Sequence, residues 1–122
     1  MSSESLHAPR ERLSRETLQL HFAITSLMEE LDAIDWYRQR ADDADDAELK
    51  GLLLHNMREE MEHAAMLLEW IRRANSDFGG FLKTYLFTEG SILGEEQAAT
   101  SVTPSGGGRS ERGFAIGSLK DG

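Results

Sequence analysis

The chain has 122 residues, of which 39% are apolar and 29% are charged, and this composition suits one small soluble domain. Its net charge of −9 excludes the basic surface that binds nucleic acid or an anionic membrane, and it favours cations as ligands. Because the sequence contains no cysteine, any bound metal must be held by oxygen atoms and imidazole.

The N-terminal residues, MSSESLHAPRERLSR, lack the apolar stretch of a secretory leader. No run in the chain approaches the ~20 apolar residues that cross a membrane. We therefore expect a cytoplasmic protein with no membrane partner, in which residues 1–13 are flexible.

Residues 14 to about 40 predict a long first helix. Ser14 can cap its N-terminus, and apolar side chains then recur at helical spacing: Leu20, Ala23, Ile24, Leu27, Leu31 and Ile34. The following stretch, ADDADDAEL, carries four aspartates, which disfavour the end of one helix and favour the start of the next. A turn is expected near residues 42–47, with Asp45 and Glu48 resembling a capping box.

A second helix is predicted from this turn to about Ala74, again with apolar side chains on one face. After a diglycine, FLKTYLF predicts a short amphipathic helix over residues 81–87 that must pack on something. Residues 14–88 thus form an all-α unit, an antiparallel hairpin with a short third helix. The Gly- and Ser-rich residues 89–112 predict a flexible linker, and residues 113–122 turn apolar again.

Carboxylates interrupt the apolar faces of both long helices at one level. On the first helix Glu30 lies between Leu27 and Ile34, and on the second Glu60 lies one turn before His63. Glu30 and Glu60 are about fifteen residues either side of the turn, so both lie ~22 Å from it. A half-buried carboxylate needs a partner, and a metal is one.

Ferritin-type di-iron bundles use one Glu from each of two helices and a Glu-x-x-His pair from each of the other two. This chain carries half of that set. Two copies packed face to face would supply two each of Glu30, Glu60 and His63, and their four carboxylates would balance two Fe²⁺ ions. The sequence therefore predicts a di-iron site shared between subunits, and hence a homodimer of hairpins.

Ordinary structural roles could also explain these residues. Glu30 and Glu60 could pair with arginine, for instance Arg58 of a neighbour, and His63 could be a hydrogen-bonded core histidine. The acids beside Glu30, which are Glu29, Asp32 and Asp35, form either a solvated face or a path that concentrates cations. Trp36 and Tyr37 are packing anchors, or Tyr37 hydrogen-bonds a ligand carboxylate.

Three stretches, MEELDAIDWY, HNMREEMEHAAMLLEW and LKTYLFTEG, resemble the encapsulated ferritin family, which comprises cargo proteins of encapsulin shells. The resemblance covers most of residues 14–90. It implies that Glu30, Glu60 and His63 are ferroxidase ligands, and that Trp36 and Tyr37 are aromatics supporting them. It also implies a secondary metal site at Glu29 and Asp32, for Ca²⁺ or another divalent ion, although Asp32 is shorter than the glutamate typical of the family.

The resemblance further implies a ferritin-like four-helix bundle in each dimer and a ring-shaped decamer, with residues 81–87 helping to join dimers. Such a ring would oxidise Fe²⁺ with O₂ and depend on a surrounding encapsulin nanocompartment to store the mineral. The C-terminal FAIGSLK looks like a shell-targeting peptide on a disordered tail, with Phe114, Ile116 and Leu119 as its anchors. Two other functions stay open: a non-catalytic acidic module that binds divalent ions or a partner helix, and a shell adaptor.

Overall fold

The computed structural model describes residues 5–101, and within this range every regular element is a helix. A 3₁₀ turn, η1 (Arg10–Arg12), precedes two long helices, α1 (Arg15–Asp43) and α2 (Ala47–Ala74). Two shorter helices follow, α3 (Ser76–Tyr85) and α4 (Ile92–Ser101). The predicted all-α fold class is confirmed. None of the described helices is both long and apolar enough to cross a membrane.

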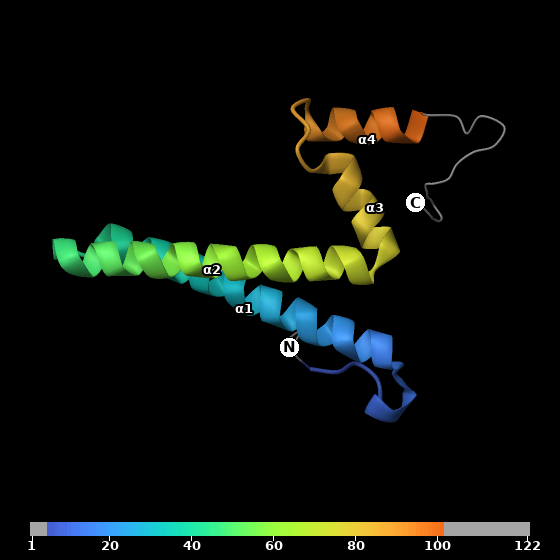
Figure 1. Ribbon diagram of the computed structural model, residues 1–122, viewed down its shortest axis with the longest axis horizontal. Helices are drawn as coiled ribbons and strands as arrows, with labels where there is room; N and C mark the ends of the chain where they lie inside the picture. The colour runs from blue at the N-terminus through green and yellow to red at the C-terminus, as the bar shows by residue number, and fades with distance from the viewer. Residues whose placement is uncertain (1–4, 102–122) are drawn as a thin grey trace. The chain divides into compact units, whose positions relative to one another are not determined.

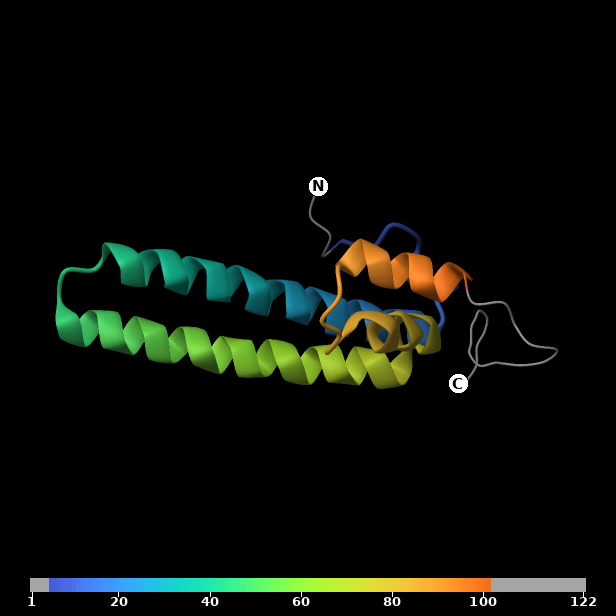
Figure 2. The same ribbon diagram turned by 90° about the horizontal axis from the view of Figure 1, so that it is seen from above.

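The two long helices form an antiparallel hairpin, joined by a tight turn at residues 44–46 (Figures 1 and 2). Ser14 caps α1 as predicted, because its side-chain oxygen accepts a hydrogen bond from the Thr17 backbone N–H at 3.1 Å. The cap of α2 differs from the prediction by one residue. Asp46, not Asp45, accepts from the backbone N–H three residues on, that of Leu49, at 2.8 Å.

Alanines make up half of the six buried apolar residues in the described part of the chain, and the other three are Leu18, Met57 and Ile71. Ala23 and Ala41 of α1 and Met57 and Ala64 of α2 are buried. They belong to two rows at alternating steps of four and three residues, and these rows also contain Glu30 and Glu60. Small residues let two helices approach closely, so polar groups in the same rows can contact each other across the seam.

Much apolar surface of the hairpin stays uncovered in the single chain. Large side chains on both helices are about half exposed, among them Phe22, Leu31, Trp36, Leu52 and Met66. A soluble monomer rarely carries so many large apolar groups in the open on one short unit. A two-helix hairpin normally covers such faces with another element or another copy.

The third helix begins five residues before its predicted start, so the prediction placed its start in the wrong position. Asn75 caps α3, accepting from the Phe78 backbone N–H at 2.8 Å, and the helix then runs through the diglycine. Glycine is needed at position 79, because a Cβ there would lie 2.7 Å from the backbone oxygen of Arg72. The diglycine therefore permits a close approach rather than breaking the helix.

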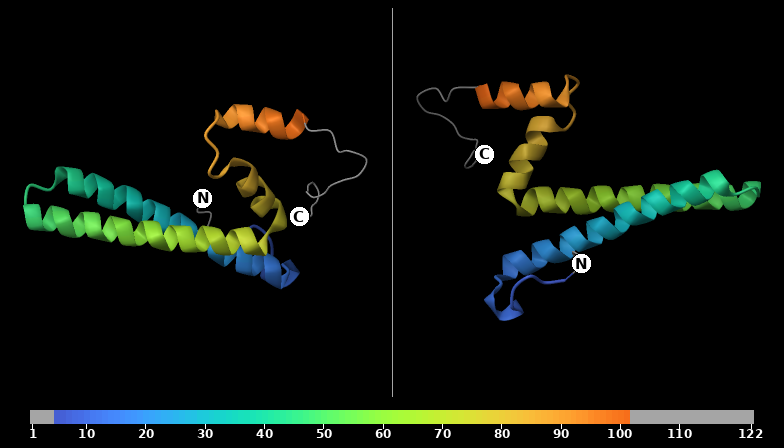
Figure 3. Two further views of the ribbon diagram at one scale, coloured as in Figure 1. Left: turned by 45° about the horizontal axis from the view of Figure 1, so that its top comes forward. Right: turned by 180° about the vertical axis from the view of Figure 1, so that it is seen from behind.

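The segment after α3 corrects the prediction of a flexible linker from residue 89. Ser91 starts α4, its hydroxyl oxygen accepting from the Gly94 backbone N–H at 2.9 Å, and α4 contacts α3 (Figure 3). The residues EEQAA favour helix, and the Gly- and Ser-rich composition that suggested a linker belongs mostly to later positions. Residues 102–112 of the predicted linker lie outside the described part of the chain.

Candidate metal centre

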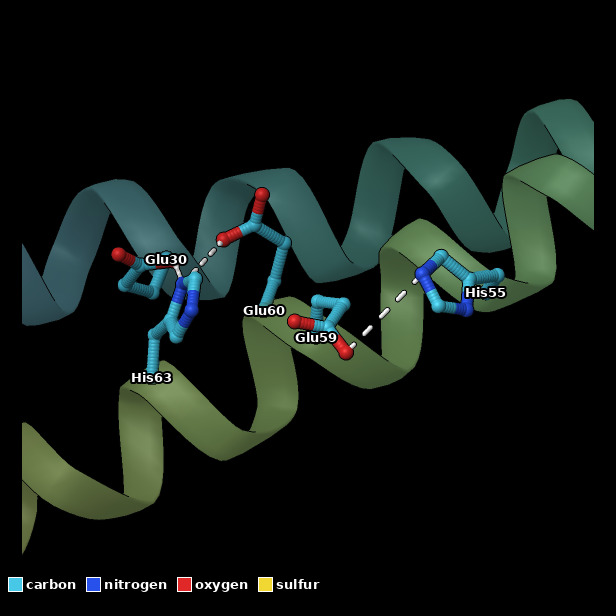
Figure 4. Close-up of polar contacts among 5 residues, drawn as sticks. All are labelled: Glu30, His55, Glu59, Glu60 and His63. Carbon is cyan, nitrogen blue, oxygen red and sulfur yellow. Dashed lines mark hydrogen bonds and ion pairs between the residues drawn. The ribbon is translucent and has the colours of Figure 1, made fainter.

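Three side chains from two helices converge on one side of the hairpin seam (Figure 4). His63 Nδ1 lies 3.2 Å from Glu60 Oε1 on its own helix and 3.6 Å from Glu30 Oε1 on α1. One potential ligand atom from each of the three residues lies within 4.8 Å of the other two. The structure thus brings together Glu30, Glu60 and His63, as the sequence predicts, at a spacing that one cation can bridge.

The regular geometry of the two helices explains this convergence. Glu60 and His63 are three residues apart, so their side chains lie on neighbouring positions of one helix face. Glu30 reaches the same level from α1 because the hairpin turn lies midway between it and Glu60 in the sequence. The site therefore depends on the register of the hairpin.

The site is open to solvent on one side in the single chain. The exposed fractions of the side chains are 23% for Glu30, 25% for Glu60 and 47% for His63. With an exposure of 47%, His63 is not a core histidine of the single chain. Among the described residues, neither glutamate forms an ion pair with an arginine, so the polar partner of each carboxylate is the imidazole of His63 or the other carboxyl.

The carboxyl groups of Glu30 and Glu60 lie close enough to shift each other's pKa. Their mutual hydrogen bond raises the pKa of Glu30, and desolvation raises it further, whereas the same bond lowers the pKa of Glu60. The hydrogen bond to Glu60 raises the pKa of His63, and the negative charges of Glu30 and Glu60 add to this rise. Two carboxylates this close repel each other, and a proton or a cation bound between them relieves this repulsion.

The predicted neighbours of the ligands lie outside this group. Glu29 and Asp32 are exposed on α1, and the structure does not bring them to the three ligand atoms. Trp36 is exposed, and Tyr37 is half-buried with the guanidinium of Arg40 5.6 Å from its ring centroid. Within the described residues, the Tyr37 hydroxyl makes no hydrogen bond to the site.

Sequence reasoning missed one polar pair beside the site. His55 Nε2 lies 4.0 Å from Glu59 Oε2 on the exposed side of α2 (Figure 4). The four-residue spacing of the pair was the available signal. The proposed shell anchors Phe114, Ile116 and Leu119 lie outside the described residues.

Comparison with known proteins shows which family this chain belongs to. The EncFtn-like family matches residues 5–89. An encapsulated ferritin-like protein of Rhodospirillum rubrum is 51% identical over 98% of this chain and 90% of its own length. A ferritin-like protein of Thermotoga maritima is 39% identical over 87% of this chain and 93% of its own length.

Two further proteins match this chain, one in sequence and one in structure. The encapsulin nanocompartment cargo protein EncC of Myxococcus xanthus is 35% identical over 75% of this chain and 76% of its own length. The crystal structure of protein NE0167 from Nitrosomonas europaea matches with a TM-score of 0.70 and 53% identity, covering 72% of this chain and 97% of that one. The match to the EncFtn-like family spans more than half of the chain and includes all three site residues. This chain therefore belongs to the EncFtn-like family of encapsulated ferritin-like proteins.

Proposed function

We propose that this protein is a ferroxidase, which oxidises Fe²⁺ to Fe³⁺ with O₂ as the electron acceptor. The observation that supports it most strongly is the grouping of Glu30, Glu60 and His63, from two helices, with their ligand atoms within 4.8 Å. Carboxylate oxygen and imidazole nitrogen are ligands that iron accepts. Membership of a ferritin-like family favours iron as the substrate over other divalent ions.

We further propose that the working site is formed by two copies of the chain. One hairpin offers two carboxylates and one imidazole, half of the ligand set of a ferritin-type di-iron bundle. The site is open to solvent in the single chain, and large apolar side chains of both helices, such as Phe22 and Leu52, are also uncovered. A second copy would cover this surface, complete a four-helix bundle and bring the charges of four carboxylates to two Fe²⁺ ions.

The residues would favour oxidation through their charge. Glu30 and Glu60 stabilise Fe³⁺ more than Fe²⁺, because the attraction of a carboxylate grows with the charge of the cation. His63 must offer an unprotonated nitrogen, and its Nδ1 already faces both carboxylates at 3.2 and 3.6 Å. Protons and Fe²⁺ would compete for these atoms, so binding of Fe²⁺ would weaken as the pH falls.

The acids and aromatics around the site would have supporting roles. Glu29 and Asp32 are exposed on α1 beside Glu30 and would raise the local concentration of Fe²⁺. The same acids could hold Ca²⁺ or another divalent ion as a secondary site. Trp36 and Tyr37 would support the ligands from the bundle side once a second copy covers them.

The cellular role that we propose is delivery of ferric iron to an encapsulin shell. A relative from Myxococcus is named an encapsulin nanocompartment cargo protein, and one from Rhodospirillum an encapsulated ferritin-like protein. We infer a cytoplasmic cargo that assembles from dimers into a decameric ring and is anchored to the shell by Phe114, Ile116 and Leu119. Removal of residues 113–122 should retain iron oxidation and abolish co-purification with the shell; lost oxidation would favour a shell adaptor.

Aerobic addition of Fe²⁺ to the purified protein tests the activity itself. The absorbance of ferric iron should rise faster with protein than with buffer alone, and O₂ should be consumed in step. Oxidation at the rate of buffer, together with normal binding of Fe²⁺ measured without O₂, would identify a non-catalytic metal-binding module instead.

A further inference from the structure

One exposed row of α2 contains the ligand His63. Its members follow each other at alternating steps of three and four residues, so they lie along one side of the helix. The row comprises Leu49, Leu52, Asn56, Glu59, His63, Met66 and Trp70. Its four large apolar members are between 43% and 62% exposed, so the row lies open in the single chain.

The chemistry of this row is nearly symmetric about Glu59. Leu49 and Trp70 lie at nearly equal distances on either side of Glu59, and so do Leu52 and Met66. Between these apolar pairs, Asn56 and His63 form a polar pair in the same way. A two-fold interface requires a surface that complements itself when it is reversed. This row meets that requirement when two copies of α2 pack antiparallel.

The ferritin-like bundle supplies the matching orientation. In that fold one long crossover joins the second helix to the third, so these two helices run parallel and the two hairpins point in opposite directions. When both hairpins are copies of one chain, the two-fold axis is perpendicular to the helices. It passes near the level of Glu60, and it brings Asn56 of each copy to the level of His63 of the partner subunit.

Both members of the polar pair have hydrogen-bonding capacity left in the single chain. Asn56 is half-buried, and among the described residues its side chain makes no hydrogen bond. The Nδ1 atom of His63 faces the two carboxylates, which leaves Nε2 on the other side of the ring. Glu59, at the centre of the row, is turned toward His55 on its own helix. A half-buried amide that an interface covers needs a partner.

We propose that Asn56 is a positioning residue for the di-iron site of the partner subunit. Its side-chain oxygen accepts a hydrogen bond from the Nε2–H of His63 of the partner subunit. This bond fixes the tautomer in which Nδ1 is free to bind metal, and it orients the imidazole ring. The inference rests on the proposed shared site, and it makes each half of that site dependent on the amide of the other chain.

Engineered cysteines test the alignment of the row, because the natural sequence contains none. In the variant L52C/M66C the two cysteines lie about 21 Å apart along one helix, so no disulfide can form within a chain. Mild oxidation should convert most of the metal-free double variant into a covalent dimer, while L52C and M66C alone stay monomeric on a non-reducing gel. Cross-linking of the single variants, or none in the double variant, would overturn the antiparallel alignment.

Substitutions of Asn56 test the hydrogen bond. Asn56→Leu keeps the size and removes the acceptor, and it should weaken anaerobic Fe²⁺ binding by about 10- to 100-fold. Asn56→Asp keeps an acceptor oxygen and should retain affinity, while Arg58→Leu, on an exposed position outside the row, controls for the added apolar group. The ¹⁵N shifts of the His63 ring should report a changed tautomer only in Asn56→Leu.

Equal affinities in Asn56→Leu and Asn56→Asp would overturn the role of Asn56. Neither the cross-linking nor the anaerobic binding depends on turnover. If the wild-type protein fails to oxidise Fe²⁺, the proposed ferroxidase function is wrong, but the cross-linking and the anaerobic binding still test the role of Asn56. If oxidation is normal and Asn56→Leu binds iron like the wild type, only this inference is wrong.

Discussion

The hairpin and the pair α3–α4 differ in the range of their polar contacts. In the hairpin, polar side chains connect two separate helices, whereas in α3 and α4 they connect neighbours in the sequence. In the hairpin, His63 of α2 contacts Glu30 of α1. In α3 and α4 the side-chain hydrogen bonds join groups three or four residues apart, such as Asn75 to Phe78, Thr84 to Gly80 and Ser91 to Gly94. Local bonds of this kind shape helix ends, whereas a metal centre needs donors from separate elements. The difference favours the hairpin as the location of the proposed metal centre.

Removal of a proposed ligand side chain should have the largest effect on iron binding and oxidation by the hairpin. Glu60→Ala and His63→Ala each delete one donor of every half-site, so bound iron and the oxidation rate should fall to the level of buffer. Glu62→Ala, at an exposed position of the same helix, is the matched control and should oxidise Fe²⁺ normally. Circular dichroism checks the fold of each variant. Full iron binding by His63→Ala would contradict the assignment of His63 as an iron ligand.

Acidification should weaken iron binding, because protons and Fe²⁺ compete for the same atoms. Contact with Glu60 raises the pKa of His63, so protonation of its ring begins at a higher pH than for an ordinary histidine. The pKa of Glu30 is raised as well, so its carboxyl takes up a proton at a higher pH than an ordinary glutamate. Anaerobic titration calorimetry should show affinity falling from about pH 7.5 to about pH 6, with proton release that depends on the buffer. An affinity independent of pH would contradict the assignment of His63 as a ligand.

Overpacking of the seam should affect iron binding less than removal of a ligand does, and it should also destabilise the hairpin. Ala64 is buried in the row that contains Glu60, and a leucine there must push the two helices apart. Ala64→Leu should lower the free energy of unfolding by about 1–3 kcal/mol and weaken iron binding by displacing Glu60 from Glu30. Ala65→Leu adds the same atoms at an exposed position and should change stability by less than about 0.5 kcal/mol. Equal stabilities in chemical denaturation would mean that the seam is not close-packed.

Removal of the C-terminal part should have the smallest effect on the chemistry. The EncFtn-like match ends at residue 89, before α4, and no member of the metal-binding group lies in α3 or α4. A chain that ends at Thr88 should therefore bind Fe²⁺ with the affinity of the full chain. A loss of affinity in the same titration would show that residues beyond 88 contribute to the site.

The sequence predicted the hairpin and the convergence of Glu30, Glu60 and His63 because both follow from regular helix geometry. The periodic apolar residues located α1 and α2, and equal spacing from the turn placed Glu30 level with Glu60. The errors lie where local and tertiary effects compete. Asp45 and Asp46 are equally good caps by type, so the aspartate that caps α2 could not be chosen from residue type alone. The diglycine was interpreted as a break, because the close approach of Gly79 to Arg72 is a tertiary contact.

The central claim is that two chains share one metal site, and a crystal structure of the iron-loaded protein tests it most directly. Anomalous scattering at the iron edge should locate two iron ions between two copies of the hairpin. Each ion should be bound by residues of both chains, with Glu30, Glu60 and His63 from each copy as the ligands. Iron bound within one hairpin alone, or at other residues, would contradict the account.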